Sequence, residues 1–180
     1  MKETSMNQTA ALQQPGDPVG AVLVMGAGIA GIQASLDLAN SGFRVYLVEK
    51  SSAVGGKMAS LDKTFPTNDC SMCIVSPKLV EVGRHPNITI LPNSDLMELD
   101  GPMGRFTAKV RKSARFVDPA ICTGCGACVE ACPIELPSEF EQGLAKRKAI
   151  YKLYPQAIPN TFSITKRGTA PCRAACPANI

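Results

Sequence analysis

The chain has 180 residues, of which 45% are hydrophobic and 19% are charged, and its formal net charge is +4. This length suits one ordinary domain, or one and a small second, and the composition is typical of a soluble globular protein. No run approaches the ~18 apolar residues that a membrane span needs. The absence of Trp and of a basic stripe interleaved with aromatic residues argues against nucleic acid as a partner.

Eight cysteines occur in a chain whose first 18 residues are polar and contain no continuous apolar core of a signal peptide. Cysteines without an export signal indicate metal or redox chemistry in a reducing compartment rather than a disulfide scaffold. The sequence therefore predicts a cytoplasmic protein, with residues 1–19 as a disordered tail.

A strand–turn–helix–strand pattern gives the strongest indication of fold. The apolar strand Ala21–Met25 runs into a G-x-G-x-x-G sequence, and a helix with apolar residues at helical spacing follows and ends near Ser41. A second strand, Phe43–Val48, is followed directly by Glu49. This pattern predicts the dinucleotide-binding turn of a Rossmann-type α/β region.

Each glycine of this turn has a distinct predicted role. Gly26 allows the tight turn, Gly28 lets the backbone approach a pyrophosphate, and Gly31 lets the helix pack closely on the strand. The pyrophosphate would then lie at the positive end of the helix. Glu49 is placed to accept hydrogen bonds from an adenosine ribose, and its charge would repel the 2′-phosphate of NADP.

Gly55 and Gly56 follow Glu49 in an E-x5-G-G pattern. The pattern resembles the two-dinucleotide-binding flavoproteins, in which the glycine pair lines the FAD pyrophosphate, so FAD is favoured over NAD. The segments NITIL, SDLMEL and RFTAKV are predicted to form a third parallel strand and an antiparallel hairpin. We expect an incomplete Rossmann-type FAD-binding region over 20–117, with further strands beyond residue 180.

The run CTGCGACVEACP has the spacing C-x2-C-x2-C-x3-C-P, which is typical of a [4Fe-4S] cluster. In bacterial-type ferredoxins the first three cysteines bind one cluster and the fourth binds another, yet this chain has one copy of the run. A structural zinc site would instead use two pairs of ligands. We therefore predict a ferredoxin-like segment over 118–163. Its predicted iron ligands are Cys122, Cys125, Cys128 and Cys132.

Cys70 and Cys73, in DCSMCIVSPK, allow three interpretations: cluster ligands, a dithiol that exchanges electrons with the flavin, or buried inert thiols. We take them as metal ligands, and they could share a second cluster with Cys132. Cys172 and Cys176 have a C-x3-C-P spacing that predicts the start of a further iron–sulfur segment, 164–180, continuing beyond this sequence.

The single histidine, His85, precedes a proline and is predicted to be a turn residue. No serine has a nearby base. We therefore expect no general acid, general base or nucleophile among these residues. The flavin and iron would carry the chemistry, and the protein would tune their potentials.

With these motifs in view, the chain closely resembles the N-terminal part of the A-type subunit of heterodisulfide reductase. The most specific match is GGKMASLDKTFPTNDCSMCIVSPKLVEVGRHPNI, because general flavoproteins lack DKTFPTNDCSMC. GAGIAGIQASLDLA, VYLVEK, CTGCGACVEACP and KRKAIYKLYPQAIPN also match. The end, RGTAPCRAACPANI, is instead similar to an iron–sulfur domain of glutamate synthase small subunits and of bacterial homologues of the A-type protein, which favours a bacterial relative with a different acceptor.

The resemblance implies an oxidoreductase subunit with FAD and several [4Fe-4S] clusters that works in a larger complex. Family members receive electron pairs from a hydrogenase or formate dehydrogenase and divide them between ferredoxin and a partner subunit that reduces a heterodisulfide, by flavin-based bifurcation. By residue match, the same glycines and Glu49 would hold FAD, and the cysteine run would hold iron.

Two other functions fit parts of the sequence. The first is an NAD(P)H-dependent flavoprotein disulfide reductase that uses Cys70 and Cys73 as its redox dithiol. The second is a scaffold that binds FAD structurally, although the density of cysteines argues against it. Electron transfer within a heterodisulfide reductase-like complex is the function that the sequence favours.

Overall fold

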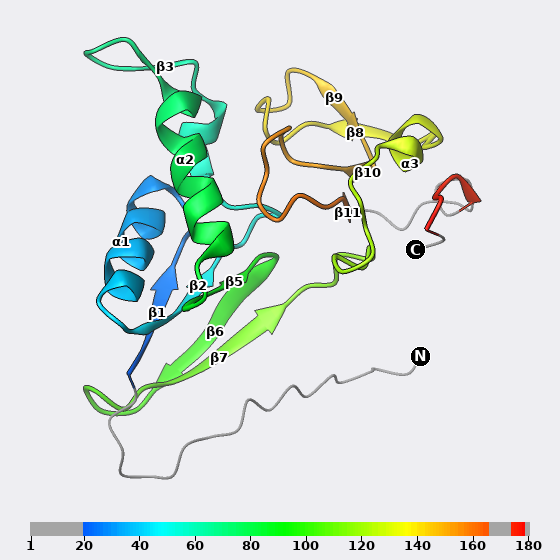
Figure 1. Ribbon diagram of the computed structural model, residues 1–180. Helices are drawn as coiled ribbons and strands as arrows, with labels where there is room; N and C mark the ends of the chain where they lie inside the picture. Colours follow the sequence, from blue (N-terminus) through cyan, green and yellow to red (C-terminus); the bar gives the residue numbers. More distant parts are fainter. Residues whose placement is uncertain (1–19, 166–173, 179–180) are drawn as a thin grey trace, which may run out of the picture.

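A computed structural model describes residues 20–165 and 174–178, and the sheet at its centre has three parallel strands (Figure 1). The strand order is β1-β2-β5, and β2 pairs in parallel with both neighbours. The strands are β1 (Ala21–Met25), β2 (Arg44–Val48) and β5 (Ile88–Leu91). The predicted third parallel strand is confirmed, and the Rossmann-type α/β assignment with it.

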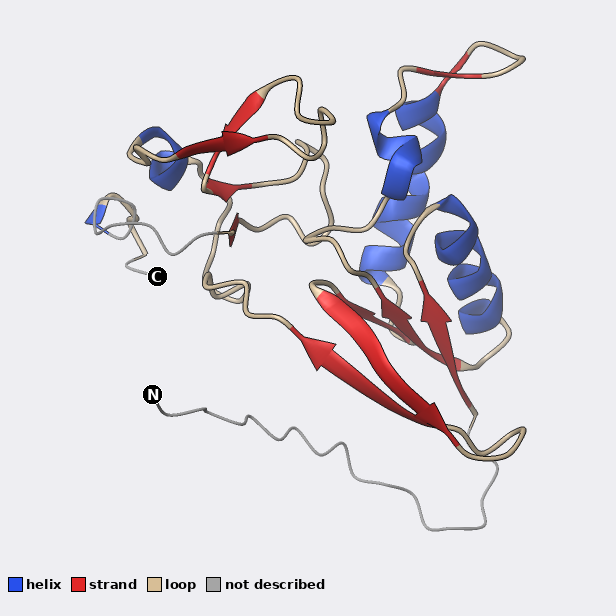
Figure 2. Cartoon of the chain, turned by 180° about the vertical axis from the view of Figure 1, so that it is seen from behind, coloured by secondary structure: helices blue, strands red, loops and turns tan. Residues whose placement is uncertain are grey.

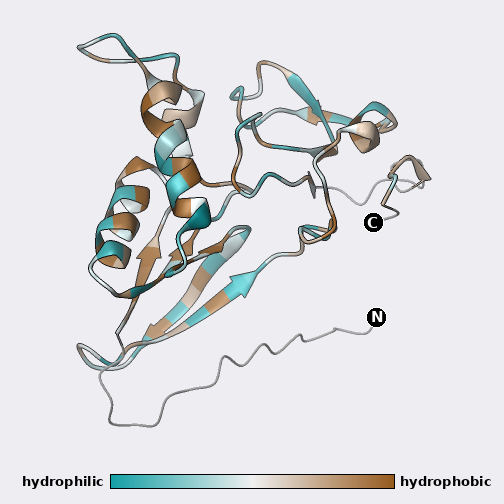
Figure 3. Cartoon of the chain, in the orientation of Figure 1, coloured by the Kyte–Doolittle hydropathy of each residue, from teal (hydrophilic) through white to brown (hydrophobic). Residues whose placement is uncertain are grey.

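Two helices connect these strands and contact each other. They are α1 (Ile29–Asn40) and α2 (Ser71–Arg84). In α1 the apolar residues at helical spacing are buried, as predicted, and Gly42, just beyond the helix, has φ +92°. Figure 3 shows the apolar stripes that these helices carry and the apolar strand β1. Together these faces form the main core.

Helix α2 was not predicted from the sequence, although its core face has a helical period. Ser71, Val75, Leu79 and Val82 are buried at spacings of four, four and three residues. Pro77 lies inside the helix, where it lacks the N–H that would continue the hydrogen-bond ladder. That proline and the two cysteines at the start hide the amphipathic pattern.

Short elements surround this unit. Between β2 and α2 lie η1 (Gly56–Ser60), β3 (Lys63–Thr64) and β4 (Asp69–Cys70), the last two paired antiparallel. After β5 the predicted hairpin is confirmed as β6 (Ser94–Asp100) and β7 (Thr107–Lys112). Figure 2 shows this hairpin as a long twisted ribbon beside the sheet.

The cysteine run lies in a second, smaller unit with its own core. Its elements are α3 (Ala127–Glu130), β8 (Glu135–Pro137), β9 (Lys146–Lys148), β10 (Ile150–Tyr151) and β11 (Ser163–Ile164). Strands β8–β9 and β10–β11 form antiparallel pairs. The second core contains Cys128, Cys132, Ala149, Ile150 and Phe162.

The expected tail, residues 1–19, and Cys172 lie outside the described residues, and the boundaries drawn between segments remain predictions. Within 20–165 and 174–178, none of the helices combines the length and apolar character that a membrane span requires.

Candidate functional site

The G-x-G-x-x-G turn joins β1 to α1 in the way its glycines predict. Gly26 has φ +90°, and its N–H donates to the carbonyl oxygen of Val48 at 2.8 Å. A Cβ on Gly31 would lie 1.9 Å from the carbonyl oxygen of Gly26, so only glycine fits where the helix crosses the turn. By contrast, nothing lies within 4 Å of the position that a Cβ on Gly28 would take.

The N-terminus of α1 opens beside this turn. No side chain caps the first turn of the helix, and no acidic residue lies in it. Its first N–H groups and the positive end of the helix dipole are therefore available to an anion. This arrangement suits a pyrophosphate.

Glu49, at the end of β2, fixes the turn to the sheet. One carboxylate oxygen accepts the N–H of Ala27 at 2.7 Å, and the other accepts both the N–H and the hydroxyl of Ser51 at 2.8 Å. The half-buried carboxylate is therefore held in one position beside the dinucleotide turn. The contact of Glu49 with a ribose stays a prediction.

Gly55 and Gly56 meet the turn from its other side. The N–H of Gly55 donates to the carbonyl oxygen of Ala27 at 2.7 Å, and a Cβ on Gly56 would lie 2.8 Å from the Cα of Gly28. Both glycines have positive φ, +127° and +58°. We call the combined feature the glycine cradle. It consists of Gly26, Gly28, Gly31, Gly55 and Gly56.

Tyr154, from the cysteine-bearing unit, closes one wall of the glycine cradle. Its hydroxyl donates to the carbonyl oxygen of Val54 and would lie 2.5 Å from a Cβ on Gly55. Its ring stacks on Phe140, with 5.6 Å between centroids. Burial raises the pKa of Tyr154 to about 12, and the charge of Glu49 adds to the effect. The phenol is thus a neutral hydrogen-bond donor.

Arg115 joins the same two units at a second point. Its guanidinium donates to the carbonyl oxygen of Ser52, and to the carbonyl and hydroxyl oxygens of Thr161 at 3.0 Å. A further bond of 3.3 Å reaches the carbonyl oxygen of Phe162. Burial lowers the pKa of Arg115, while the nearby Tyr151 and Cys122 oppose that shift. A half-buried cation therefore lies near the first cysteine of the run.

Sequence reasoning missed both residues. Tyr154 bonds across 100 positions and Arg115 across 63, and a single sequence has no local pattern that reveals such pairs. The nearest signal is that Tyr154 lies within the KLYPQAIPN segment that the family resemblance includes.

The cysteine run forms a loop that turns into α3. The N–H of Cys122 donates to the carbonyl oxygen of Asp118 at 3.0 Å, and Gly124 and Gly126 have φ of +73° and +92°. Cys122 is half-buried and Cys125 is exposed, whereas Cys128 and Cys132 are buried. The two glycines allow the backbone reversals that the spacing predicts.

The thiols of the run influence one another. Burial raises the pKa of Cys128 to about 11, and the neighbouring sulfurs of Cys122, Cys176 and Cys125 raise it further. A buried thiol of this kind becomes a thiolate when a cation such as iron compensates its charge. The donor set therefore suits an iron–sulfur cluster. Among the described residues, no three Cys, His, Asp or Glu side chains converge as tightly as a single metal ion would need.

Cys132 is buried in the second core. Its thiol donates to the carbonyl oxygen of Ile134 at 3.7 Å, within the second core. Cys132 shares this core with Cys128, and Cys122 packs against it. The division of these cysteines between clusters stays a prediction.

Cys70 and Cys73 do not join the run. They form a disulfide at the N-terminus of α2, and Figure 1 places that end of α2 and α3 on opposite sides of the molecule. In this form neither sulfur is a thiolate ligand. The structure therefore does not bring them together with Cys132. His85 lies in a turn, as predicted, where one ring nitrogen accepts the N–H of Asn87 at 3.1 Å.

Two family models match the chain. Residues 21–69 match FAD dependent oxidoreductase, which covers the glycine cradle, and residues 115–136 match the 4Fe-4S binding domain, which covers the cysteine run. The crystal structure of L-proline dehydrogenase from P. horikoshii aligns with 51% of this chain and 19% of that chain, at 26% identity and a TM-score of 0.42. The fold assignment rests on strand order and the family models.

Curated relatives extend the match. Over 142 residues the chain is 59% identical to an A-type iron-sulfur subunit of the CoB--CoM heterodisulfide reductase of Methanopyrus kandleri, covering 79% of this chain and 22% of that protein. It is 52% identical to the A-type subunit of the H(2):CoB-CoM heterodisulfide,ferredoxin reductase of Methanothermobacter marburgensis, covering 80% and 22%. The chain is 49% identical to the A-like heterodisulfide reductase protein of Archaeoglobus profundus, and this match covers 87% of this chain and 26% of that protein.

The glycine cradle and the cysteine run, with these matches, define a flavin and iron–sulfur protein whose cofactors are FAD and [4Fe-4S]. More particularly, the chain belongs to the family of A-type heterodisulfide reductase subunits. It spans about a fifth of the length of these curated relatives. The matches favour electron transfer over the NAD(P)H-dependent disulfide reductase that the sequence also allowed.

Proposed function

We propose that this chain is the FAD- and cluster-binding region of an electron-transfer subunit in a heterodisulfide reductase-like complex, an oxidoreductase that passes electrons between a two-electron donor, FAD, [4Fe-4S] clusters and partner subunits. The supporting observation is the direct packing of the cysteine-bearing unit on the glycine cradle. Tyr154 and Arg115 form that contact. A flavin site and an iron site on adjoining units suit electron transfer between them.

In this proposal the glycine cradle holds the FAD pyrophosphate at the N-terminus of α1, and Glu49 receives the ribose hydroxyls. The open space beside Gly28 and the close approach of Gly56 support this placement. The bound flavin supplies the exchange between two-electron and one-electron chemistry. The chain's own residues orient the cofactor, and Tyr154 supplies a wall that excludes water beside Gly55.

Iron is assigned to the run. Cys122, Cys125 and Cys128 would share one cluster, with Cys132 as a ligand directed toward a second. The mutual influence of the first three sulfurs and the ferredoxin spacing of the run support this division. Arg115, near Cys122, would stabilise the more negative, reduced cluster. Cys70 and Cys73 are left out of this ligand set because they form a disulfide.

The partners follow from the relatives' names, which describe subunits of heterodisulfide reductases that use hydrogen, formate or ferredoxin. We propose other subunits of such a complex as partners, and a ferredoxin or a hydrogenase- or dehydrogenase-type protein as electron donor. Cluster chemistry on cysteine thiolates suits the reducing cytoplasm. Electron bifurcation at the flavin is a further expectation from the family.

Anaerobic purification of the full-length protein tests this proposal. Flavin, iron and acid-labile sulfide are quantified, and EPR follows the clusters in a redox titration. Cys128→Ser should lower iron and sulfide and leave flavin in place, whereas Ala131→Ser, at a non-ligand position in the same run, should leave all three unchanged. Absence of flavin would contradict the FAD assignment, and zinc without sulfide would contradict the cluster.

A further inference from the structure

One irregular loop contributes to both cores of the molecule. It covers residues 152–162, between the paired strands β10 and β11, and we call it the connecting loop. Its first half places Tyr154 and Ala157, 4% and 1% exposed, in the main core. Its last residue, Phe162, is buried in the second core together with two cysteines of the run. Because protein interiors are close-packed, a displacement at one end of this loop affects the packing at the other.

The first half of the connecting loop holds one wall of the glycine cradle. Both backbone groups of Val54 bond to it: the carbonyl oxygen accepts the hydroxyl of Tyr154, and the N–H donates to the carbonyl oxygen of Ile158 at 2.9 Å. Gly55 comes next, and its N–H donates to the carbonyl oxygen of Ala27 in the dinucleotide turn at 2.7 Å. The connecting loop therefore fixes the position of Gly55 against the turn.

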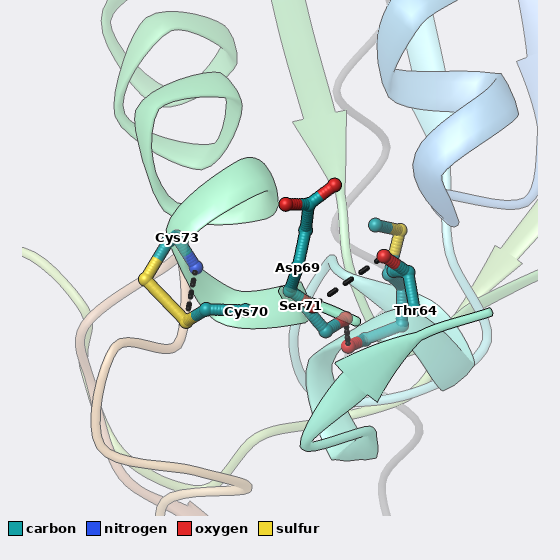
Figure 4. The surroundings of a disulfide bond; sticks show 6 residues. Thr64, Asp69, Cys70, Ser71 and Cys73 are labelled. Atoms are coloured by element: carbon teal, nitrogen blue, oxygen red, sulfur yellow. Dashed lines mark hydrogen bonds between the residues drawn. A yellow bond between two sulfur atoms is a disulfide. The ribbon is translucent and has the colours of Figure 1, made fainter. Parts of the chain in front are cut away.

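The other side of the glycine pair is held without the connecting loop. Gly56 begins η1, and Ser71, at the start of α2 (Figure 4), donates its hydroxyl to the carbonyl oxygen of Met58 in η1 at 2.7 Å. Ser71 is fully buried, so this anchor belongs to the main unit. A change in the connecting loop consequently acts on the glycine cradle through Val54 and Gly55.

The second half of the connecting loop packs on the cysteine run. A Cβ on Gly124 would lie 3.2 Å from the carbonyl oxygen of Asn160, so the two backbones are in contact. Gly124 has φ +73° and lies between Cys122, which is half-buried, and Cys125, which is exposed. Residues 122–126 are irregular, so ligation of iron by these two cysteines would fix this part of the run in place.

Arg115 joins the same parts of the molecule by a second route. Its guanidinium donates to the carbonyl oxygen of Ser52, two residues before Val54, and to the carbonyl oxygen of Thr161 in the connecting loop at 3.0 Å. The cation also lies near Cys122. The backbone that leads into the glycine cradle is thus bonded to the connecting loop at Val54 directly and at Ser52 through Arg115.

We propose that the connecting loop couples the two cofactors: a cluster on the cysteine run strengthens FAD binding at the glycine cradle, and bound FAD strengthens retention of the cluster. Iron on the first two cysteines orders the backbone around Gly124, which supports Asn160 and, through the loop, Val54. Loss of the cluster relaxes this part of the run, while Cys128 on α3 stays in the second core. The coupling rests on the proposed function, since it needs both cofactors.

The coupling is reciprocal, because each cofactor favours the same arrangement of the connecting loop. A chain that has lost its cluster would release FAD more readily than an intact chain. Tight binding of FAD would then be confined to chains in which a one-electron acceptor adjoins the flavin site.

Titration with FAD tests the coupling in the full-length protein, prepared anaerobically with its clusters and stripped of flavin. Cys125→Ala removes an exposed ligand, whereas Ala131→Ser leaves the ligands of the run intact. We expect the FAD dissociation constant, followed by flavin fluorescence, to rise about 5-fold or more in Cys125→Ala and to stay unchanged in Ala131→Ser. The dissociation constant is measured because a tight site keeps its flavin on purification even after such a change. Equal values for Cys125→Ala and the wild type would overturn the coupling.

A second set of variants tests the route through the connecting loop. Tyr154→Phe removes one of the two bonds between Val54 and the loop, so the effect of Cys125→Ala on the FAD dissociation constant should shrink in this background. Tyr46→Phe is the matched control, because it removes the same hydroxyl from the middle of the central strand β2 and should leave that effect unchanged. An effect as large in Tyr154→Phe as in the wild type would contradict this route.

Hydrogen exchange separates the coupling from the flavin assignment, because it needs no FAD. In flavin-free protein we expect the N–H groups of Val54 and Gly55 to exchange several-fold faster in Cys125→Ala than in the wild type, and the β6–β7 hairpin to exchange equally in both. Unchanged exchange at Val54 and Gly55 would refute the coupling. A wild-type protein that binds no FAD would instead overturn the proposed function, and the exchange would still show whether loss of the cluster reaches the glycine cradle.

Discussion

The hydroxyl of Tyr154 donates a hydrogen bond to the carbonyl oxygen of Val54, and this bond joins the cysteine-bearing unit to the wall of the glycine cradle. Beside it, the N–H of Val54 donates to the carbonyl oxygen of Ile158 at 2.9 Å, in an isolated β-bridge between the same two units. The side chain of Arg115 adds a third contact between the units by donating to the carbonyl oxygen of Ser52. The two units therefore share one interface made largely of backbone carbonyls and a few side-chain donors.

Removing the phenol hydroxyl tests the value of this bond. Tyr154→Phe keeps the ring and its stacking on Phe140 but leaves the carbonyl oxygen of Val54 without this donor. An unsatisfied buried acceptor costs about 1–3 kcal/mol. We expect the free energy of unfolding to fall by that amount in urea titrations. A variant as stable as the wild type would show that water or another donor replaces the hydroxyl.

The same tyrosine predicts a dependence on pH. The folded-state pKa is about 12 and the ordinary value is 10.0, so the neutral phenol is favoured in the folded protein. This contribution to stability is complete below pH 10 and is lost as the pH rises toward 12. The difference in unfolding free energy between wild type and Tyr154→Phe should therefore shrink over this range. A constant difference would contradict the raised pKa.

Two glycines of the cradle form a matched pair. Gly31→Ala places a methyl group 1.9 Å from the carbonyl oxygen of Gly26, and we expect a loss of more than about 2 kcal/mol in stability. Gly28→Ala meets no atom within 4 Å and should leave thermal unfolding of the flavin-free protein nearly unchanged. It should nevertheless weaken FAD binding, measured by flavin fluorescence, because the methyl group obstructs the approach of the pyrophosphate.

Arg115→Met removes the guanidinium N–H groups that donate to the carbonyl oxygens of Ser52, Thr161 and Phe162. Leaving these carbonyls unsatisfied should cost about 3 kcal/mol or more, and the cluster potential should become more negative because a cation near Cys122 is lost. Arg115→Lys should restore part of the potential. Arg111→Met is the control, since its exposed ion pair with Asp95 spans 3.8 Å and should be worth less than about 1 kcal/mol. An unchanged cluster potential in Arg115→Met would show that the charge of Arg115 does not act on the cluster.

After removal of iron, the thiols of the cysteine run should differ in their rates of alkylation. At pH 8 a thiol with a pKa of about 11 is only about 0.1% thiolate, so buried Cys128 should alkylate far more slowly than exposed Cys125 in chelator-treated protein. Unfolding in guanidinium should equalise the two rates. Similar rates in the folded, iron-free protein would mean that the loop opens when iron leaves.

How much the sequence predicts depends on the range of each interaction. The β1–α1–β2 unit and the β6–β7 hairpin follow from local periodicity and from turn glycines such as Gly26. Helix α2 was missed because Pro77 and the cysteines mask a buried face that Val75 and Leu79 define. The positions of the glycines in the cradle were predictable from their motif.

Long-range pairings were beyond single-sequence reasoning. Nothing near Val54 indicates that its carbonyl receives a phenol from Tyr154, and nothing in the spacing of Cys70 and Cys73 separates a disulfide from a ligand pair. The first depends on which surfaces meet after folding, whereas the second is a local pair whose spacing of three residues suits a disulfide and a ligand pair alike. The sequence accordingly predicted the chemistry of the site better than the contacts that assemble it.

The bridge from Val54 to Ile158 also determines when, during synthesis of the chain, the flavin site can close. The wall of the glycine cradle at Gly55 is incomplete until residue 158 has left the ribosome. At about 5–20 residues per second, this takes about 5–20 s after Val54 is made. Flavin loading into a finished pocket must therefore follow translation of the cysteine run, so the iron ligands are already present when the flavin site closes.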